Sequence, residues 1–166
     1  MPIPPFVLDL RSHVGHAPLW LPGVSAVVRD DAGRLLLGRR ADTGRWAVVS
    51  GILDPGEEPA VGAAREVLEE TGLRVVVDGL AALSVTGPVH YPNGDVTDYL
   101  DLLFVCRLAD GVAPEDAHVG DDESLDVAWF PPDALPDDLT ESSVERLAWA
   151  TTFLADPAAE PRFVRP

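Results

Sequence analysis

The alternation of apolar and polar positions along the chain predicts a mixture of strands and helices. Apolar runs predict strands at residues 23–29, 34–40, 46–49, 74–77, 83–87, 96–107 and 124–130. Helical spacing predicts a short helix near residues 6–13, a second over 58–71, and a third from 141 to about 154. Turn residues at 30–33 and 91–95 join pairs of strands, and residues 156–166 are expected to fray. Strands and helices mixed at these lengths indicate one α/β domain.

The central helix has the most informative pattern. Glu66, Glu69 and Glu70 lie at i, i+3 and i+4, so their carboxylates project from one helical face. Gly72 is placed to end this helix, as Thr140 is placed to begin the last one. The opposite face is expected to pack on the core through the apolar residues Val61, Ala64, Val67 and Leu68. Like charges at this spacing repel, and a hard divalent cation with oxygen ligands would relieve the repulsion.

The overall charge limits the function classes. The chain of 166 residues has 28 acidic and 12 basic residues, for a net charge of −16, and every basic residue is an arginine. The absence of lysine excludes a Walker A lysine, a Schiff-base lysine and a lysine nucleophile. A surface this acidic repels phosphate backbones, so we expect no nucleic-acid partner. A phosphorylated substrate would therefore be approached with the help of divalent cations.

Cysteine usage and hydropathy give the cellular context. Cys106 is the single cysteine, which excludes an intrachain disulfide, and its place in a β-rich run predicts burial. The sequence contains no run of 18 apolar residues, so no membrane partner is expected. We therefore expect a soluble cytoplasmic protein.

A spaced motif at residues 51–73 carries the functional information. Gly51 is followed after five residues by Glu57 and after seven more by Arg65-Glu66-Val67-Leu68-Glu69-Glu70-Thr71-Gly72-Leu73. This segment resembles the Nudix box, G-x5-E-x7-R-E-U-x-E-E-x-G-U, at every defined position. Residues 39–40, Trp46, the acidic run 121–123 and the later 128–130 segment are also similar to the family pattern. One departure is Val49-Ser50, where many members have Pro-Gly.

The resemblance implies a fold and a metal site. Nudix proteins have a mixed β-sheet between helices, an α/β/α sandwich, in which the box forms a loop–helix–loop that holds Mg²⁺ or Mn²⁺. Carried over by position, Glu66 and Glu70 would be the main metal ligands, with Glu69 and the carbonyl of Gly51 contributing. Glu57 would be an outer ligand or would position water. Arg65 would orient the carboxylates.

The resemblance also implies hydrolysis of a nucleoside diphosphate linked to another moiety. Glu66 is our first candidate for the general base, and Glu123 in the late acidic run is the competitor. Arg39 and Arg40 are candidates for holding the substrate's phosphates, since arginine offers bidentate contacts. Tyr91 is a candidate for stacking on a base.

Two residues after the box bear on the substrate and point to different classes. Pro88 matches a position typical of ADP-ribose pyrophosphatases, whereas Tyr91 matches one typical of dinucleoside polyphosphate hydrolases. We place ADP-ribose or a nucleotide sugar first, and a nucleoside triphosphate or dinucleoside polyphosphate second. A non-catalytic nucleotide-sensing domain is the alternative function.

The expected domain organisation follows from the extent of the resemblance. It gives an N-terminal extension (1–21), a hydrolase domain (22–155) and a C-terminal tail (156–166). The partner that we expect is a small-molecule nucleotide substrate. Because relatives are often dimers, the sequence leaves open whether the chain forms a homodimer.

Overall fold

A curled, mixed β-sheet organises the chain, and the computed structural model describes residues 3–166. The strand order is β3-β2-β1-β6-β5, with β4 also pairing with β1 and β7 with β2. Strand β1 is parallel to β6 and antiparallel to β2 and β4. The strands are β1 (Leu19–Arg29), β2 (Leu35–Arg40), β3 (Trp46–Ala47), β4 (Val49–Ile52), β5 (Val75–His90), β6 (Val96–Leu108) and β7 (Ser124–Phe130).

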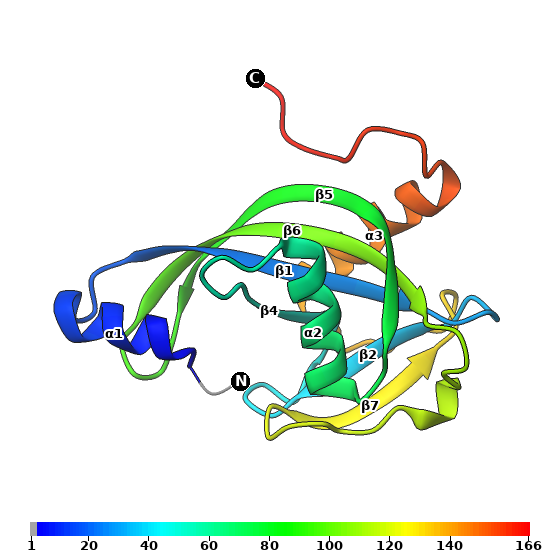
Figure 1. Cartoon of the computed structure of the whole chain (residues 1–166), viewed down its shortest axis with the longest axis horizontal. Helices are drawn as coiled ribbons and strands as arrows, with labels where there is room; N and C mark the ends of the chain where they lie inside the picture. The colour runs from blue at the N-terminus through cyan, green and yellow to red at the C-terminus, as the bar shows by residue number, and fades with distance from the viewer. Residues whose placement is uncertain (1–2) are drawn as a thin grey trace.

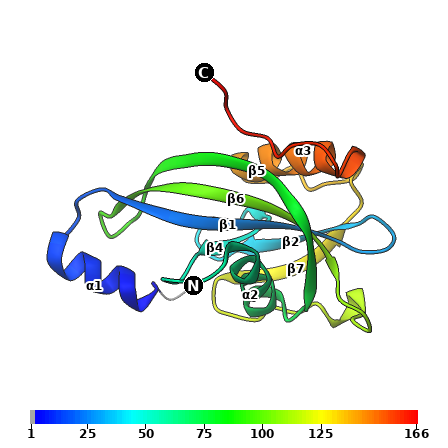
Figure 2. The ribbon, with the colours of Figure 1, turned by 45° about the horizontal axis from the view of Figure 1, so that its top comes forward.

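Helices cover both faces of the sheet, as Figures 1 and 2 show. Helix α2 (Pro59–Thr71) packs on one face and α3 (Glu141–Ala155) on the other, while α1 (Pro5–Val14) lies at one end beside the tip of the β5–β6 hairpin. A short 3-10 helix, η1 (Pro114–Asp116), follows β6. The predicted α/β/α layering around a mixed sheet is confirmed.

Alternate residues of the central strands divide the core into two halves. On the α2 side, Val24 and Val28 pack with Val67 and the buried Cys106. On the α3 side, the core contains Val27, Leu37, Leu103, Val105, Leu147 and Ala150. The burial predicted for Cys106 is confirmed, and it raises the pKa of the thiol to about 12.

The predicted helix ends agree closely with the structure. Gly72 has a left-handed φ of 72°, and its N–H donates to the Leu68 carbonyl to end α2. Thr140 precedes α3, where its Oγ1 accepts a hydrogen bond from the Ser143 N–H at 3.3 Å. Among residues 3–166, no helix is long and apolar enough to cross a membrane.

Three sequence expectations were wrong. The strands expected at 74–77 and 83–87 are parts of one long strand, β5, which continues through register shifts along β6. The strand expected at 46–49 is divided into β3 and β4, which pair with different neighbours. The tail is not frayed throughout, because Arg162 hydrogen-bonds through its main chain to Ala81 and Leu83 at the edge of β5.

A buried ion pair joins α3 to the sheet. The Nε of Arg146 donates to Asp101 on β6 at 2.9 Å, and the Ser25 hydroxyl donates to the other carboxylate oxygen at 2.7 Å. Both charged side chains are nearly excluded from solvent. Removing one partner of such a pair leaves the other charge buried and uncompensated.

We therefore predict that Arg146→Met lowers the free energy of unfolding by about 3 kcal/mol. The matched control is Arg165→Met, which breaks an ion pair with Glu160 in which both side chains are largely exposed and should cost about 0.5 kcal/mol or less. Urea denaturation of both variants measures the difference. Equal losses in the two variants would contradict the prediction.

Candidate functional site

The motif at residues 51–73 folds as a strand, a loop and a helix. Strand β4 lies antiparallel to β1 with Gly51 opposite Val24, and a loop leads from it to α2. Pro59 occupies the first helical turn, where its fixed φ and missing N–H cost nothing. The predicted loop–helix–loop is therefore present, with its helix packed against the sheet.

The face of α2 that meets the core differs from the expected one. Val67 is fully buried, but Val61 and Leu68 are 61% and 45% exposed. Glu66, by contrast, is 1% exposed. The helix is rotated so that this carboxylate points inward, and the expectation that Val61 and Leu68 face the sheet was wrong.

Arg65 joins three of the four acids of the motif. Its Nε and Nη2 donate to the two oxygens of Glu57, both at 2.8 Å, and its Nη1 donates to Glu66 at 2.9 Å and Glu69 at 3.0 Å. A further hydrogen bond reaches the Ile52 carbonyl. This guanidinium lowers the pKa of Glu57, and the Arg65 pKa is itself raised by the same carboxylates. Arg65 thus occupies the orienting position that the resemblance implies.

Gly51 makes room for the buried carboxylate. A Cβ at this position would lie 2.0 Å from Cδ of Glu66 and just over 2 Å from its oxygens, so any other residue would displace the side chain. One oxygen of Glu66 accepts from Arg65, while the buried Oε2 has no hydrogen-bond partner among residues 3–166. Burial raises the pKa of Glu66 to about 7, against the opposing effect of Arg65.

Glu70 lies one turn further along the same face. Its burial, followed by the charges of Glu66 and Asp121, raises its pKa to about 8, although the Ser50 N–H donates a hydrogen bond to it. Two neighbouring carboxylates are therefore held in an environment that disfavours their ionised forms. A cation placed between them would reverse this effect, because its charge favours deprotonated ligands.

The donor set suits a hard cation. Carboxylate oxygens from Glu57, Glu66, Glu69 and Glu70 and the carbonyl of Gly51 are the ligand type that Mg²⁺ and Mn²⁺ prefer. Within residues 3–166, no three acidic, histidine or cysteine side chains are yet gathered around one point. Three of these carboxylates are bound by Arg65 instead. The buried, unpartnered oxygen of Glu66 and the oxygen-rich donor set fit such an ion.

A loop after β6 brings further acids to the helix. The N–H groups of His118 and Gly120 donate hydrogen bonds to main-chain carbonyls in the last turn of α2. The charge of Asp121, the next residue, contributes to the raised pKa of Glu70. Glu123 follows on the same loop and is partly buried. Sequence reasoning singled out Glu123 but missed Asp121 as a neighbour of Glu70. The contiguous acidic run at residues 121–123 is the feature of the sequence that could have indicated this neighbour.

The structure separates the two candidate phosphate-binding arginines. Arg40 is bound by Asp42 at 2.6 and 2.9 Å, and it lies near enough to Glu70 and Tyr91 for their charges to raise its pKa. Arg39 points elsewhere and donates to the Gly44 carbonyl at 2.9 Å, as alternation along a strand requires. The Tyr91 hydroxyl lies 2.6 Å from that of Tyr99. Arg40 is therefore near Glu70, and Tyr91 is near Arg40. Arg39 lies on the same strand, with its side chain bound to the turn that follows.

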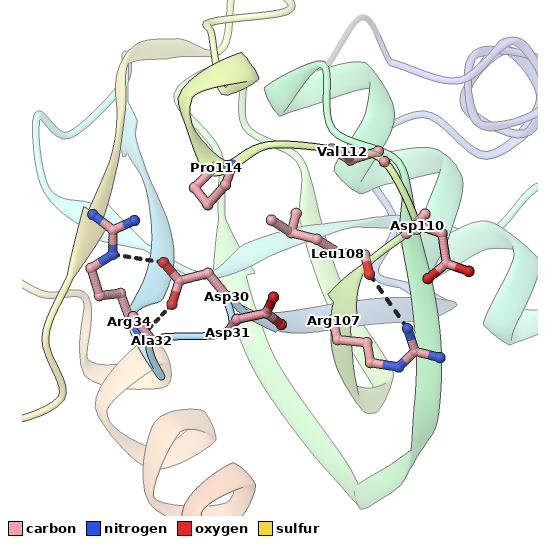
Figure 3. Close-up of a pocket in the computed structure, with 11 residues that line it drawn as sticks. Asp30, Asp31, Ala32, Arg34, Arg107, Leu108, Asp110, Val112 and Pro114 are labelled. Atoms are coloured by element: carbon pink, nitrogen blue, oxygen red, sulfur yellow. Dashed lines mark hydrogen bonds and ion pairs between the residues drawn. The ribbon is translucent and has the colours of Figure 1, made fainter.

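A surface cavity of about 460 Å³ lies apart from this cluster (Figure 3). It is formed by the β1–β2 turn and the segment that follows β6, and none of the motif acids lines it. Arg34 is held there by Asp30 at 2.6 Å, so its charge is already compensated. The candidate metal site consists of the motif carboxylates, and this cavity is not part of it.

Comparison with known proteins agrees with the motif. The profile of the NUDIX domain matches residues 19–150. A MutT-like protein of Streptomyces ambofaciens is 38% identical over 130 residues, covering 78% of this chain and 76% of its own. The 8-oxo-dGDP phosphatase of Homo sapiens is 28% identical over 147 residues, and the match spans 87% of this chain but 41% of the human protein.

Solved structures share the fold at lower identity. An ADP-ribose pyrophosphatase from Streptococcus suis superposes with a TM-score of 0.66 at 22% identity, over 87% of this chain and 98% of that one. A MutT NUDIX hydrolase from Burkholderia pseudomallei gives 0.63 at 24% identity, over 78% and 97%. At these identities the likeness concerns the fold alone.

The space at Gly51 gives a direct prediction. Gly51→Ala places a Cβ against the Glu66 carboxylate, so we expect a lower Tm and loss of stabilisation by Mn²⁺. Gly79→Ala on β5 is the matched control, because its Cβ would meet the Phe153 ring at 2.7 Å, so it should lower the Tm and leave the stabilisation by Mn²⁺ intact. Thermal unfolding with and without Mn²⁺ measures both effects. A Gly51→Ala protein that Mn²⁺ stabilises as well as wild type would refute the assignment.

The raised pKa values predict how stability varies with pH. Because the pKa values of Glu66 and Glu70 are about 7 and 8 in the folded protein against 4.5 ordinarily, their contribution to stability is full below pH 4.5. This contribution to the free energy of unfolding is lost as the pH rises from about 4.5 through the folded-state pKa values of about 7 and 8. We expect the Tm of the metal-free protein to fall across this range, and Glu70→Gln to reduce the fall.

The exposed Glu58 supplies the control for this titration, since Glu58→Gln should keep the wild-type slope. Mn²⁺ should raise the Tm more at pH 8 than at pH 6, because its ligands must be deprotonated. A wild-type Tm that is flat with pH in the absence of metal would contradict the prediction.

Proposed function

Because the chain belongs to the Nudix family of hydrolases, which act on pyrophosphate bonds, we propose that it cleaves a nucleoside diphosphate linked to another moiety. The observation that carries this proposal is the carboxylate of Glu66, buried against Gly51 with one oxygen unpartnered among residues 3–166. Burying an acid in this way is costly unless a charge compensates it. The compensating groups are Arg65 and a divalent cation.

The proposed cofactor is Mg²⁺ or Mn²⁺, held by Glu66 and Glu70 with help from Glu69 and the Gly51 carbonyl. When bound, such an ion neutralises phosphate charge, activates water and stabilises the leaving oxygen. Glu57 is partly buried and bound to Arg65 through both oxygens, which suits an outer position. Arg65 binds one oxygen of Glu66 and one of Glu69, so the other oxygen of each carboxylate would be the one offered to the ion.

The proton of the attacking water needs an acceptor near the acids of α2. Glu66 is our first candidate, because its carboxylate is buried among the motif acids with one oxygen unpartnered within residues 3–166. Glu123 is the second, because its loop is docked on the same helix. In either case the acceptor lies on a fixed element, which keeps it aligned with the bond to be cleaved.

Arg40 and Tyr91 are the proposed substrate contacts. Arg40 lies near Glu70 and would offer its guanidinium to a phosphate oxygen in exchange for Asp42. Tyr91 is 39% exposed and is braced by Tyr99, so its ring is available to a nucleobase. Arg39 is bound to the Gly44 carbonyl of the following turn, which gives it a supporting role at most.

The substrate moiety has two candidates. ADP-ribose or a nucleotide sugar is the expectation from the proline at position 88. A nucleoside triphosphate or dinucleoside polyphosphate is favoured by the placement of Tyr91 near Arg40. The name of the human relative, 8-oxo-dGDP phosphatase, also favours a free purine nucleotide. We therefore test both classes side by side.

A hydrolysis panel tests the function. We expect Mg²⁺-dependent release of a nucleoside monophosphate from one of ADP-ribose, UDP-glucose, diadenosine tetraphosphate, dGTP and 8-oxo-dGTP, ranked by kcat/KM. Glu70→Gln should lower kcat/KM at least about 100-fold, since even outer partners of a metal site contribute ten- to a hundredfold. Glu145→Gln, an exposed acid on α3, is the charge-matched control and should leave the rate unchanged.

The outcomes separate the alternatives. Turnover of a substrate other than ADP-ribose would support the proposed hydrolysis and identify a different substrate. Binding of nucleotides without turnover of any of them would replace the hydrolase by a nucleotide sensor. Turnover that survives both EDTA and Glu70→Gln would refute the metal site.

A further inference from the structure

Two arginines lie side by side where the parallel strands β1 and β6 end. Arg29 is the last residue of β1, and it pairs in register with Arg107 near the end of β6. Neighbouring strands lie about 4.8 Å apart, and residues paired in this way project to the same face of the sheet. The two guanidiniums therefore leave the sheet from adjacent points, and their like charges repel each other.

This arginine pair belongs to the face of the sheet that α3 covers. Val27 and Val105, two residues earlier on the same strands, pack in the half of the core that contains α3 residues. Side chains along a strand alternate between the two faces, so Arg29 and Arg107 continue the same two rows beyond the core. The motif acids lie on α2, which packs on the other face. The arginine pair is therefore separate from the candidate metal site.

One carboxylate serves both arginines. Asp78 is the extra residue of a bulge in β5, where the register along β6 shifts between Val77 and Gly79. Its Oδ1 lies 3.2 Å from Nε of Arg107, and its Oδ2 lies 3.8 Å from Nη2 of Arg29. Two positive charges thus share one negative charge. The pair keeps a local excess of positive charge, although the chain as a whole has a net charge of −16.

The hydrogen-bond donors of the pair are largely unused. The Arg29 side chain makes no hydrogen bond within residues 3–166, and its buried Nε has no partner there. Arg107 makes one, from Nη1 to the Leu108 carbonyl at the long distance of 3.5 Å (Figure 3). By contrast, Arg40 and Arg146 each hold a carboxylate, at 2.6 and 2.9 Å. Both the charge and the donors of the pair are therefore available to an anion.

The available groups fit an oxyanion. A guanidinium presents its N–H groups as a planar fork that binds two oxygens of a phosphate at once. A tetrahedral phosphate has enough oxygens to accept hydrogen bonds from two such forks. The side chains of Arg29 and Arg107 are 43% and 47% exposed, so a ligand reaches their terminal nitrogens from solvent.

We propose that Arg29 and Arg107 form a binding site for a phosphate group, on the face of the sheet away from the motif acids. The phosphate accepts hydrogen bonds from the Nη groups of both arginines, and Asp78 competes with it for their charge. This site needs neither a divalent cation nor the motif acids, so it goes beyond the proposed function. Free inorganic phosphate and the phosphate of a nucleotide share this chemistry.

Nuclear magnetic resonance of the arginine Nε–H groups tests the proposal with the full-length protein. Inorganic phosphate is titrated at constant ionic strength with EDTA present, and Arg29→Gln and Arg107→Gln assign the two resonances. We expect both resonances of the wild-type protein to shift with one saturable Kd. Each single substitution should weaken binding about tenfold, read from the arginine that remains, because it removes charge-assisted hydrogen bonds.

Arg165→Gln is the matched control, because Arg165 is an exposed arginine paired with Glu160 in the C-terminal tail; its Kd should equal that of wild type. Asp78→Asn should tighten phosphate binding, since it removes the competing carboxylate. A pair that only held Asp78 in place would show no saturable shift in either protein. The wild-type titration decides this without relying on the folding of any variant.

Three results would overturn the proposal. They are shifts that do not saturate and are as large at Arg165 as at the pair, an unchanged Kd in both Arg29→Gln and Arg107→Gln, and weaker binding in Asp78→Asn. A parallel titration with AMP identifies the source of the phosphate group. A lower Kd for AMP than for inorganic phosphate at the same two resonances supports a site for a nucleotide phosphate, and an equal or higher Kd supports a site for free phosphate.

Discussion

The burial of one ionisable side chain, Glu66, is the constraint on which the site depends. Its carboxylate lies against the strand residue Gly51, and this contact requires a glycine, fixes the rotation of α2 and leaves Val61 and Leu68 in solvent. Strand β4 pairs with β1 in the register that sets Gly51 opposite Val24, and a shift by one residue would turn another side chain toward the carboxylate. Helix α2 therefore buries a carboxylate and leaves two apolar side chains exposed.

Arg65 makes this burial tolerable in the absence of a cation. In a chain of net charge −16 it is the guanidinium that touches three motif acids at once, at 2.8 to 3.0 Å. Repulsion between acids on one helical face costs about 0.2–0.5 kcal/mol per pair, which a single well-placed guanidinium can offset. Glu70 makes no hydrogen bond with Arg65, and burial together with the charges of Glu66 and Asp121 raises its pKa to about 8.

The motif and the helix ends could be predicted from the sequence because they depend on local chemistry. Spacing identified the acids of 51–73, and capping residues identified the ends of α2 and α3. The inward rotation of Glu66 could not be predicted, because apolar periodicity assumes that acids face water. The same holds for the docking of Gly120 and for the tail at Arg162, which depend on contacts between segments far apart in the chain. Alternation along β2 could have indicated that Arg39 and Arg40 point to different sides.

The parallel pairing of β1 with β6 has a consequence for how the chain is made. Leu19 pairs with Thr97, so the central strand leaves the ribosome ~80 residues before its long partner. At ordinary synthesis rates this is a wait of roughly 4–16 s. During that time the apolar residues of β1 have β2 and β4 as neighbours on one edge and none on the other. The nascent chain therefore passes through a stage in which one edge of β1 is open, and an open edge is where two such chains can pair.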